Sequence, residues 1–318
     1  MDAPTSPPVT LDDIEAAAER IKARVRRTPC LRTRFIREPV HPNLVLKLEC
    51  LQVTGSFKAR GANNAVLSLD DAALKRGIIT ASGGNHGIAV AYAGQASGVP
   101  TVVYLPERAD AAVAAKIERW GGQVIIEGDL WDDAQTAALQ HADRNGLTYV
   151  HPFADPAVIA GQGTVAREML KQSPGIDVIV AGIGGGGLIS GIALAAKAMK
   201  PEITIIGVEP TGAPTLRNSL NAGAVTTLDR VDTKAITLAP RASAALNLGI
   251  IRDYVDDIVL VDDAAMQAAT SWLFREIGIA ADLSGAAALA ALHSGAVQVP
   301  ADATVCAVVC GAGTDGLV

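Results

Sequence analysis

The sequence predicts an α/β protein built on two parallel β-sheets. Short apolar runs alternate with helix-length segments along most of the 318 residues, and strands separated by helices pair in parallel through right-handed crossovers. Hydrophobic residues make up 49% of the chain and aromatic residues 3%, a composition that suits closely packed α/β layers with substantial cores. Because the length exceeds that of a usual single domain, we expect one large or two intertwined domains.

The first expected elements lead into a segment that contains a single lysine. Thr10 is a suitable N-cap for a helix in which Ile14, Ala17 and Ile21 recur at helical spacing. An apolar strand is expected next, followed by the lysine segment and its helix. These two elements span residues 44–48 and 62–69.

From residue 77 onward the alternation is regular. Strands are expected at 77–81, 101–105, 123–126 and 148–151, with helices at 87–97, 109–120 and 131–145 between them. A second alternation follows, with helices at 160–172 and 188–199 and strands at 178–183, 204–209 and 304–309. The segment 216–236 is less periodic, so we expect partly irregular surface there.

Charge and cysteine usage exclude several classes of function. The net charge of −6 offers no basic surface for a phosphate backbone, so no nucleic-acid partner is expected. The four cysteines lack zinc-type pairing with histidines and are expected to be free thiols. No apolar run approaches about 18 residues and the N-terminus lacks a basic region followed by an apolar one. We therefore expect a cytoplasmic protein without a membrane partner.

The segment from Thr54 to Ala62 is the first candidate for chemistry. It places a turn glycine, a small hydroxyl, an aromatic residue and Lys58 immediately before an alanine-rich helix. Burial disfavours the charged form of an amine and lowers its pKa, which prepares a lysine to act as a nucleophile toward an aldehyde. Taken alone, a solvated surface lysine is the competing interpretation.

A run of four glycines, Gly184 to Gly187, is the second candidate. It joins the expected strand 178–183 to the helix that follows, where bare backbone N–H groups and the positive helix end can bind a phosphate. A dinucleotide site competes with this interpretation, because Glu209 follows Gly187 by a suitable interval after its own strand. A simple strand-to-helix turn is the structural alternative, although it rarely demands four glycines.

Four motifs follow one another in an order that resembles a known family. They are Thr54–Gly61, Ser82–Gly87, Gly184–Leu188 and Val308–Gly313. In this order they resemble the fold-type II pyridoxal-phosphate enzymes, and most closely the serine/threonine dehydratases, from about Thr28 to the C-terminus. The resemblance implies a tryptophan-synthase-β-like fold with a smaller domain inserted in a larger one. It places the small substrate-loop domain at 75–150 and the large cofactor-binding domain at 1–74 and 151–318, and it implies a homodimer.

The resemblance also implies a role for each motif. Lys58 would hold pyridoxal 5'-phosphate covalently beside Phe57, and Asn85 would contact the phenolic oxygen of the cofactor ring. Cys310 would face the pyridine nitrogen as a neutral thiol, unless it is only a buried apolar cysteine. The phosphate would bind Gly184, Gly185, Gly186, Gly187 and Leu188, and the carboxylate of an amino-acid substrate would bind the loop Ser82, Gly83, Gly84, Asn85 and His86.

The activity implied is dehydrative deamination of a β-hydroxy amino acid such as L-serine or L-threonine. One alternative is a serine or hydroxyaspartate racemase; serine racemases place a serine two residues before the loop asparagine, where this chain has Gly83. A second is β-replacement of the cysteine-synthase kind, whose members have Asp-Arg after the lysine, whereas Lys58 precedes Ala-Arg-Gly. A non-enzymatic phosphate or nucleotide sensor is the third.

Three positions depart from the pattern of the family. Several members bind a divalent cation through a glutamate and an aspartate six residues later, but Glu209 is followed at that spacing by Thr215. A hydroxyl supplies only part of what Mg²⁺ or Ca²⁺ requires, so no metal is expected, with Glu209 as the one candidate ligand. Asp282 stands where members commonly carry a glutamate. Arg241 lies in a segment that is commonly glycine-rich, and it is a candidate to bind a second substrate carboxylate.

Overall fold

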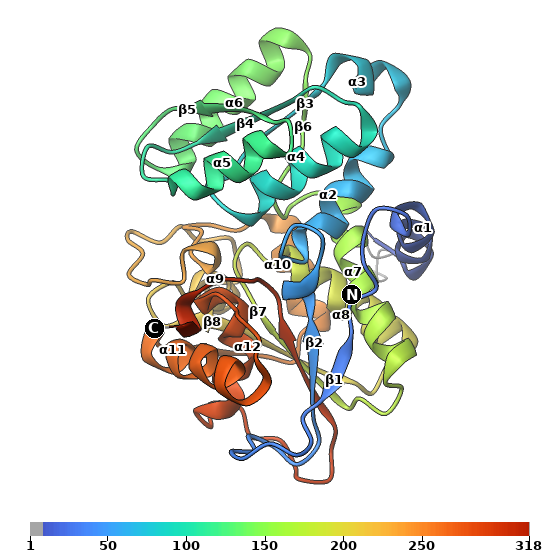
Figure 1. The fold of residues 1–318 in the computed structure, drawn as a ribbon, viewed down its shortest axis with the longest axis vertical. Coiled ribbons are helices and arrows are strands. Elements are labelled where there is room, and N and C mark those ends of the chain that lie inside the picture. The colour runs from blue at the N-terminus through green and yellow to red at the C-terminus, as the bar shows by residue number, and fades with distance from the viewer. Residues whose placement is uncertain (1–8, 318) are drawn as a thin grey trace.

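The computed structural model describes residues 9–317, which form two β-sheets surrounded by helices. A six-stranded sheet has the order β1-β2-β10-β7-β8-β9, and a four-stranded sheet has the order β5-β4-β3-β6. Figure 1 shows the four-stranded sheet with α4, α5 and α6 above the six-stranded sheet, and α2 at the junction. We call these the small unit and the large unit. The α/β fold class with two parallel-dominated sheets is confirmed.

The elements have the following bounds. The strands are β1 (Cys30–Arg32), β2 (Leu44–Leu48), β3 (Ile78–Ala81), β4 (Thr101–Leu105), β5 (Gln123–Ile126), β6 (Thr148–Tyr149), β7 (Val178–Gly182), β8 (Thr204–Pro210), β9 (Asp257–Val261) and β10 (Val305–Val309). The helices are α1 (Leu11–Ile21), α2 (Lys58–Leu67), α3 (Asp71–Arg76), α4 (Asn85–Ser97), α5 (Ala111–Arg119), α6 (Trp131–Asn145), α7 (Pro156–Gln172), α8 (Gly187–Met199), α9 (Thr215–Ala222), α10 (Ala245–Tyr254), α11 (Asp263–Trp272) and α12 (Leu283–His293).

The structure adds detail to two expectations about the elements. The large sheet is parallel except at its edge, where β1 pairs antiparallel with β2. The segment 216–236 is partly irregular, as expected, but α9 occupies its start and buries Leu216 and Ser219. The local sequence hides α9 because the N-cap residue, Pro214, provides no side-chain cap. Glu209, at the end of the preceding strand, instead accepts the backbone N–H groups of Leu216 and Arg217.

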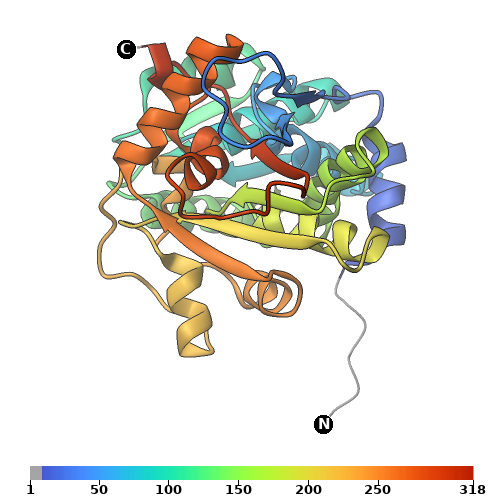
Figure 2. The ribbon, with the colours of Figure 1, turned by 90° about the horizontal axis from the view of Figure 1, so that it is seen from below.

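The large sheet is covered on both faces, which explains its continuous apolar strands. Every residue of strands β7 and β10 is buried. Their side chains point alternately to the two faces of the sheet and enter two separate cores. One core joins the sheet to α1, α7, α8 and α10, and the other joins it to α11 and α12. Figure 2 looks at this unit from below and shows helices on the two sides of the sheet.

The topology brings three of the four predicted motifs to one edge of the large sheet. Strands β2 and β7 both pair in parallel with β10, so their carboxyl ends lie side by side where ligands usually bind in such sheets. The lysine segment follows β2, the glycine run follows β7, and Cys310 follows β10. Backbone contact fixes α2 on α7: a Cβ added at Gly161 would lie 2.6 Å from Cα of Gly61.

Candidate active site

Lys58 is the first residue of α2, and its amine is prepared for chemistry. Its Nζ donates a hydrogen bond of 2.6 Å to the carbonyl oxygen of Pro152 and lies 5.2 Å from the ring centroid of Phe57. Desolvation lowers the pKa of Lys58 to about 8, because an apolar surrounding disfavours the ammonium form. A neutral, nucleophilic amine is therefore accessible near physiological pH.

The terminal loop holds the lysine segment in place. Phe57 N donates to the carbonyl oxygen of Cys310 at 3.2 Å, and Ser56 and Gly311 form an antiparallel bridge. The Cys310 thiol is buried, donates to the carbonyl of Ser284 at 3.5 Å, and has its pKa raised by burial. Lys58 and a neutral Cys310 thiol are thus brought together.

A buried network of charges anchors the helix that carries Lys58. The guanidinium of Arg60 forms two bonds of 2.8 Å to the carboxylate of Glu49 and two of 2.9 Å to that of Glu168. Lys47 donates to Glu168 at 2.8 Å. Burial alone would raise the pKa of Glu49, but Arg60 and Lys47 outweigh it and hold that pKa below its usual value. We call these four residues the Arg60 network.

The loop between β3 and α4 presents a helix N-terminus. Asn85 is the first residue of α4, and Gly84 is its N-cap. The hydroxyl of Ser82 accepts a hydrogen bond of 3.3 Å from the backbone N–H of Gly84. The ring Nε2 of His86 lies 3.1 Å from the carbonyl oxygen of Val150, and burial lowers the pKa of His86 well below its usual value. A neutral His86 therefore supports the loop, whose free N–H groups can receive a carboxylate.

Asp282 reaches the same place from α12, a contact that sequence reasoning missed. It caps α12, and its side chain meets that of Asn85 beside Gly311. A Cβ added at Gly311 would lie 3.1 Å from both Asp282 carboxylate oxygens and 3.3 Å from Asn85 Nδ2. Burial raises the pKa of Asp282 to about 6, although the hydrogen bond that its carboxylate accepts from the backbone N–H of Gly285 opposes the shift. The cap residue before a Gly-Ala helix was the available signal.

The four glycines form a bare cradle at the start of α8. Gly186 has φ +93°, which favours glycine. A Cβ at Gly185 would come within 2.3 Å of the Phe153 ring, and one at Gly184 within 2.8 Å of the Thr237 carbonyl oxygen. The hydroxyl of Ser243 donates to the carbonyl of Gly185 at 2.9 Å. The loop therefore tolerates no side chains, and the N-terminus of α8 suits a phosphate.

Unpartnered polar atoms also point to a ligand at this edge. Within the described part of the chain, Thr54 Oγ1, Ser56 Oγ and His86 Nδ1 are buried without a hydrogen-bond partner, and such atoms normally have one. They lie in the lysine segment and in the asparagine loop. Together with the glycine cradle and the Lys58 amine, they fit pyridoxal phosphate.

The geometry of Glu209 does not fit a cation or a ribose. Its two carboxylate oxygens accept the N–H groups of Leu216 and Arg217 at 2.8 and 2.9 Å, and Thr215 donates its hydroxyl to the carbonyl of Pro240 at 2.7 Å. Both oxygens of the candidate ligand are thus used to cap α9. The dinucleotide interpretation loses its ribose-binding carboxylate for the same reason.

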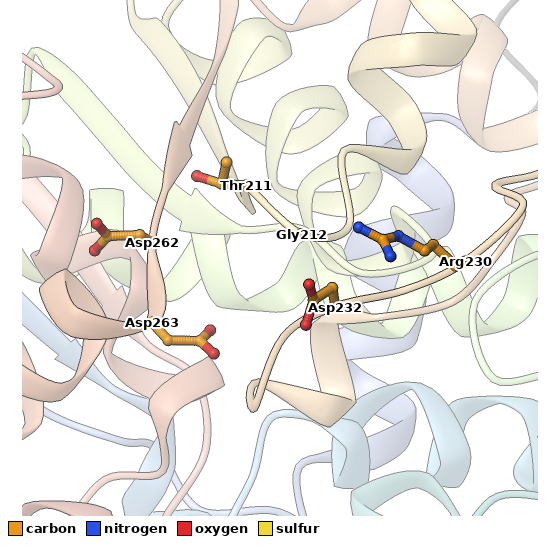
Figure 3. Close-up of a pocket in the computed structure, with 6 residues that line it drawn as sticks. All are labelled: Thr211, Gly212, Arg230, Asp232, Asp262 and Asp263. Carbon is orange, nitrogen blue, oxygen red and sulfur yellow. The ribbon is translucent and has the colours of Figure 1, made fainter.

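A separate surface pocket lies beyond the ends of β8 and β9. Asp263 accepts the Thr233 hydroxyl and the Lys234 backbone N–H at 2.5 and 2.8 Å, and Asp262 caps α11. The carboxylates of Asp262 and Asp263 are thus engaged in local hydrogen bonds, and residues 9–317 contain no group of three or more His, Cys, Asp or Glu placed to hold a metal. Figure 3 shows the lining residues Thr211, Gly212, Arg230, Asp232, Asp262 and Asp263, which include no predicted site residue.

Of the helices between residues 9 and 317, none combines the length and the apolar character that crossing a membrane requires. This finding agrees with the segment lengths read from the sequence.

Known proteins resemble this chain along nearly its whole length. The sequence pattern of the family described as "Pyridoxal-phosphate dependent enzyme" matches residues 21–311. An L-threonine ammonia-lyase of Thermotoga maritima is 38% identical over 89% of this chain and 71% of its own length. A β-hydroxyaspartate dehydratase of Paracoccus denitrificans is 37% identical over 89% of this chain and 90% of its own.

Solved structures agree with these matches. The structure of maize serine racemase superposes with a TM-score of 0.91 and 36% identity, covering 96% of this chain and 94% of that one. Serine racemases and threonine ammonia-lyases match about equally well in sequence, at 34–40% identity. The chain therefore belongs to the fold-type II pyridoxal-phosphate-dependent enzymes, in the family of the serine/threonine dehydratases and serine racemases.

Proposed function

We propose that the protein catalyses the dehydrative deamination of a β-hydroxy amino acid to a 2-oxo acid and ammonia. The observation that carries this proposal is the asymmetry of the acid–base groups around the site. Lys58 supplies an amine whose pKa is lowered to about 8, whereas position 83, where a racemase carries a serine, holds glycine. The site thus has a base for Cα without an evident proton donor on the opposite side.

Each motif has a part in this reaction. Bound pyridoxal phosphate supplies an electron sink for the charge that develops on Cα. The Gly184–Gly187 cradle and α8 hold its phosphate, and the N-terminus of α4 with Ser82 binds the substrate carboxylate. Lys58 takes the Cα proton and passes it to the departing β-hydroxyl, which leaves as water as the Cβ–O bond breaks. Water then hydrolyses the released enamine to the 2-oxo acid and ammonia.

Cys310 and two neighbouring histidines also bear on the balance between elimination and side reactions. We propose that Cys310, whose pKa is raised by burial, would face the ring nitrogen of bound pyridoxal phosphate as a neutral thiol; a neutral thiol would not keep that nitrogen protonated, so less charge would spread into the ring. Neighbouring histidines do not compete with Lys58 as bases. Burial lowers the pKa of His151 to about 4, and His86 is neutral for the same reason.

Serine racemisation is the second candidate, because racemases match the chain as well as lyases do. The test is product analysis of the holoenzyme with L-serine and L-threonine, measuring 2-oxo acid and D-serine. We expect 2-oxo acid with little D-serine. A Cβ at Gly83 would meet Ala109 and Pro106 only at 3.4 Å, an ordinary contact, so Gly83→Ser is tolerated and should raise the D-serine share. Substantial D-serine from the wild type would make racemisation the function.

Simple assays distinguish the proposed function from two other hypotheses, a β-replacement enzyme and a phosphate sensor. β-Replacement would yield cysteine from O-acetylserine and sulfide faster than serine yields pyruvate. A phosphate sensor would bind phosphate yet remain colourless after incubation with pyridoxal phosphate, whereas the covalently held cofactor absorbs visible light and responds to added amino acid. We further propose, from the family resemblance, that the protein acts as a homodimer.

A further inference from the structure

Arg241 and Asp132 form an ion pair between the two units. Nη1 of Arg241, in the segment before α10, lies 3.5 Å from Oδ2 of Asp132 near the start of α6. Among the ion pairs of residues 9–317, it alone joins the small unit to the large unit. The pair therefore spans the junction at which the motifs meet.

Chain neighbours of both partners contact the candidate site. Beside Asp132, Trp131 donates to the carbonyl oxygen of Ala81 at 2.9 Å, directly before the asparagine loop, and its ring lies 6.4 Å from that of Phe153. Two residues after Arg241, the hydroxyl of Ser243 donates to the cradle at Gly185. The chain segments that carry the ion pair thus border the site, one beside the substrate loop and the other beside the phosphate cradle.

The guanidinium of Arg241 is held firmly at its Nε atom and makes only a weak contact through Nη1. Its Nε donates to the carbonyl oxygen of Leu228 at 2.9 Å, which orients the group. The contact with Asp132 is a single one at 3.5 Å between side chains that are 39% and 49% exposed. An arginine normally binds a carboxylate through two parallel bonds of about 2.7–2.9 Å. A better-placed carboxylate can therefore displace Asp132.

We propose that Arg241 is a specificity-determining residue that binds a second carboxylate of the substrate, and that Asp132 occupies this place beforehand. This inference rests on the proposed function and narrows its substrate class to β-hydroxy amino acids with a side-chain carboxylate, the 3-hydroxyaspartates. Their Cα–H and Cβ–O bonds break as above, and hydrolysis yields oxaloacetate and ammonia. Serine and threonine carry no side-chain charge, so they leave the ion pair in place.

The first test is the ratio of kcat/KM for L-3-hydroxyaspartate, both threo and erythro, to that for L-serine. The wild type should favour one hydroxyaspartate isomer. Arg241→Gln should lower the ratio on the order of 100-fold, mainly through KM, because a charge-assisted bidentate contact is lost. Arg230→Gln removes the same charge from an exposed position of the preceding loop and should change the ratio less than about twofold.

The second test measures binding without turnover. Succinate, a dicarboxylate, is titrated into the holoenzyme by calorimetry, with butyrate as the matched monocarboxylate. The Arg241→Gln variant should bind succinate more weakly than the wild type does, with its affinity for butyrate unchanged. The Asp132→Asn variant should bind succinate several-fold more tightly, because the side chain that competes for Arg241 has lost its charge. Equal succinate affinity in wild type and Arg241→Gln, or an unchanged kcat/KM ratio, would overturn the inference.

The two proposals fail in different ways. If the holoenzyme eliminates water from serine, threonine and hydroxyaspartate alike, and Arg241→Gln lowers kcat/KM for all three substrates by the same factor, the dehydratase function stands and the specificity assignment is wrong. If none of the three is converted to a 2-oxo acid, the proposed function itself fails, whatever the calorimetry shows.

Discussion

The Arg60 network and the Arg241–Asp132 pair use the same chemistry in opposite surroundings. Arg60 is 1% exposed and binds two carboxylates through four bonds of 2.8–2.9 Å, whereas Arg241 touches one exposed carboxylate at 3.5 Å. A dry, fully paired guanidinium cannot exchange partners, because an uncompensated buried charge would remain. A solvent-exposed guanidinium with a single partner, such as that of Arg241, can exchange it. The first arrangement suits a fixed helix start at Lys58, and the second suits a site that must release and bind.

The largest effect expected from this comparison is on stability. Arg60→Met leaves the buried Glu49 and the largely buried Glu168 near each other without their shared partner, which should lower the free energy of unfolding by about 3–5 kcal/mol. Arg241→Met, the matched change at the rim, should lower it by less than about 1 kcal/mol. Urea unfolding followed by tryptophan fluorescence measures both. Similar losses in the two variants would contradict the contrast between buried and exposed pairs.

The sequence predicted the main elements of the fold and the local motifs of the site, but it did not predict the contacts between elements on which this contrast depends. Period and apolar content located most strands, and the glycine run and Lys58 were recognisable because their chemistry is local. The Arg60 network was not, because its members come from β2, the 3-10 turn that follows it, α2 and α7, and meet only after folding. The same holds for Asp282 beside Asn85 and for Glu209 capping α9, since each contact spans elements that no local pattern connects.

The second expected effect concerns the amine that the network positions. Because burial lowers the pKa of Lys58 to about 8, the neutral amine is scarce at pH 6 and dominant above pH 8. The rate at which the apoprotein incorporates pyridoxal phosphate should therefore rise about tenfold per pH unit from pH 6 and level off near pH 8. Stopped-flow absorbance measures it. A rise that continues to about pH 10.5, the ordinary value, would show that the amine is solvated.

The smallest effect concerns Glu209, a buried carboxylate whose oxygens accept hydrogen bonds from backbone N–H groups instead of from an arginine. EDTA and Mg²⁺ should leave the Tm of the wild type unchanged. Thr215→Asp places a second carboxylate nearby and should lower the free energy of unfolding by about 1–2 kcal/mol through like-charge repulsion, with millimolar Mg²⁺ restoring it by binding the folded state. Thr215→Asn is the uncharged control and should not respond to Mg²⁺. A wild-type Tm that falls in EDTA would argue for a native cation.

The central claim, that Lys58 carries the cofactor, is tested most directly by chemical trapping. The holoenzyme is reduced with borohydride, which makes the link between lysine and cofactor permanent, and its peptides are then mapped by mass spectrometry. We expect the label on Lys58 alone, and none in the Lys58→Ala variant. Label on Lys47 or Lys75, with Lys58 unmodified, would contradict the account.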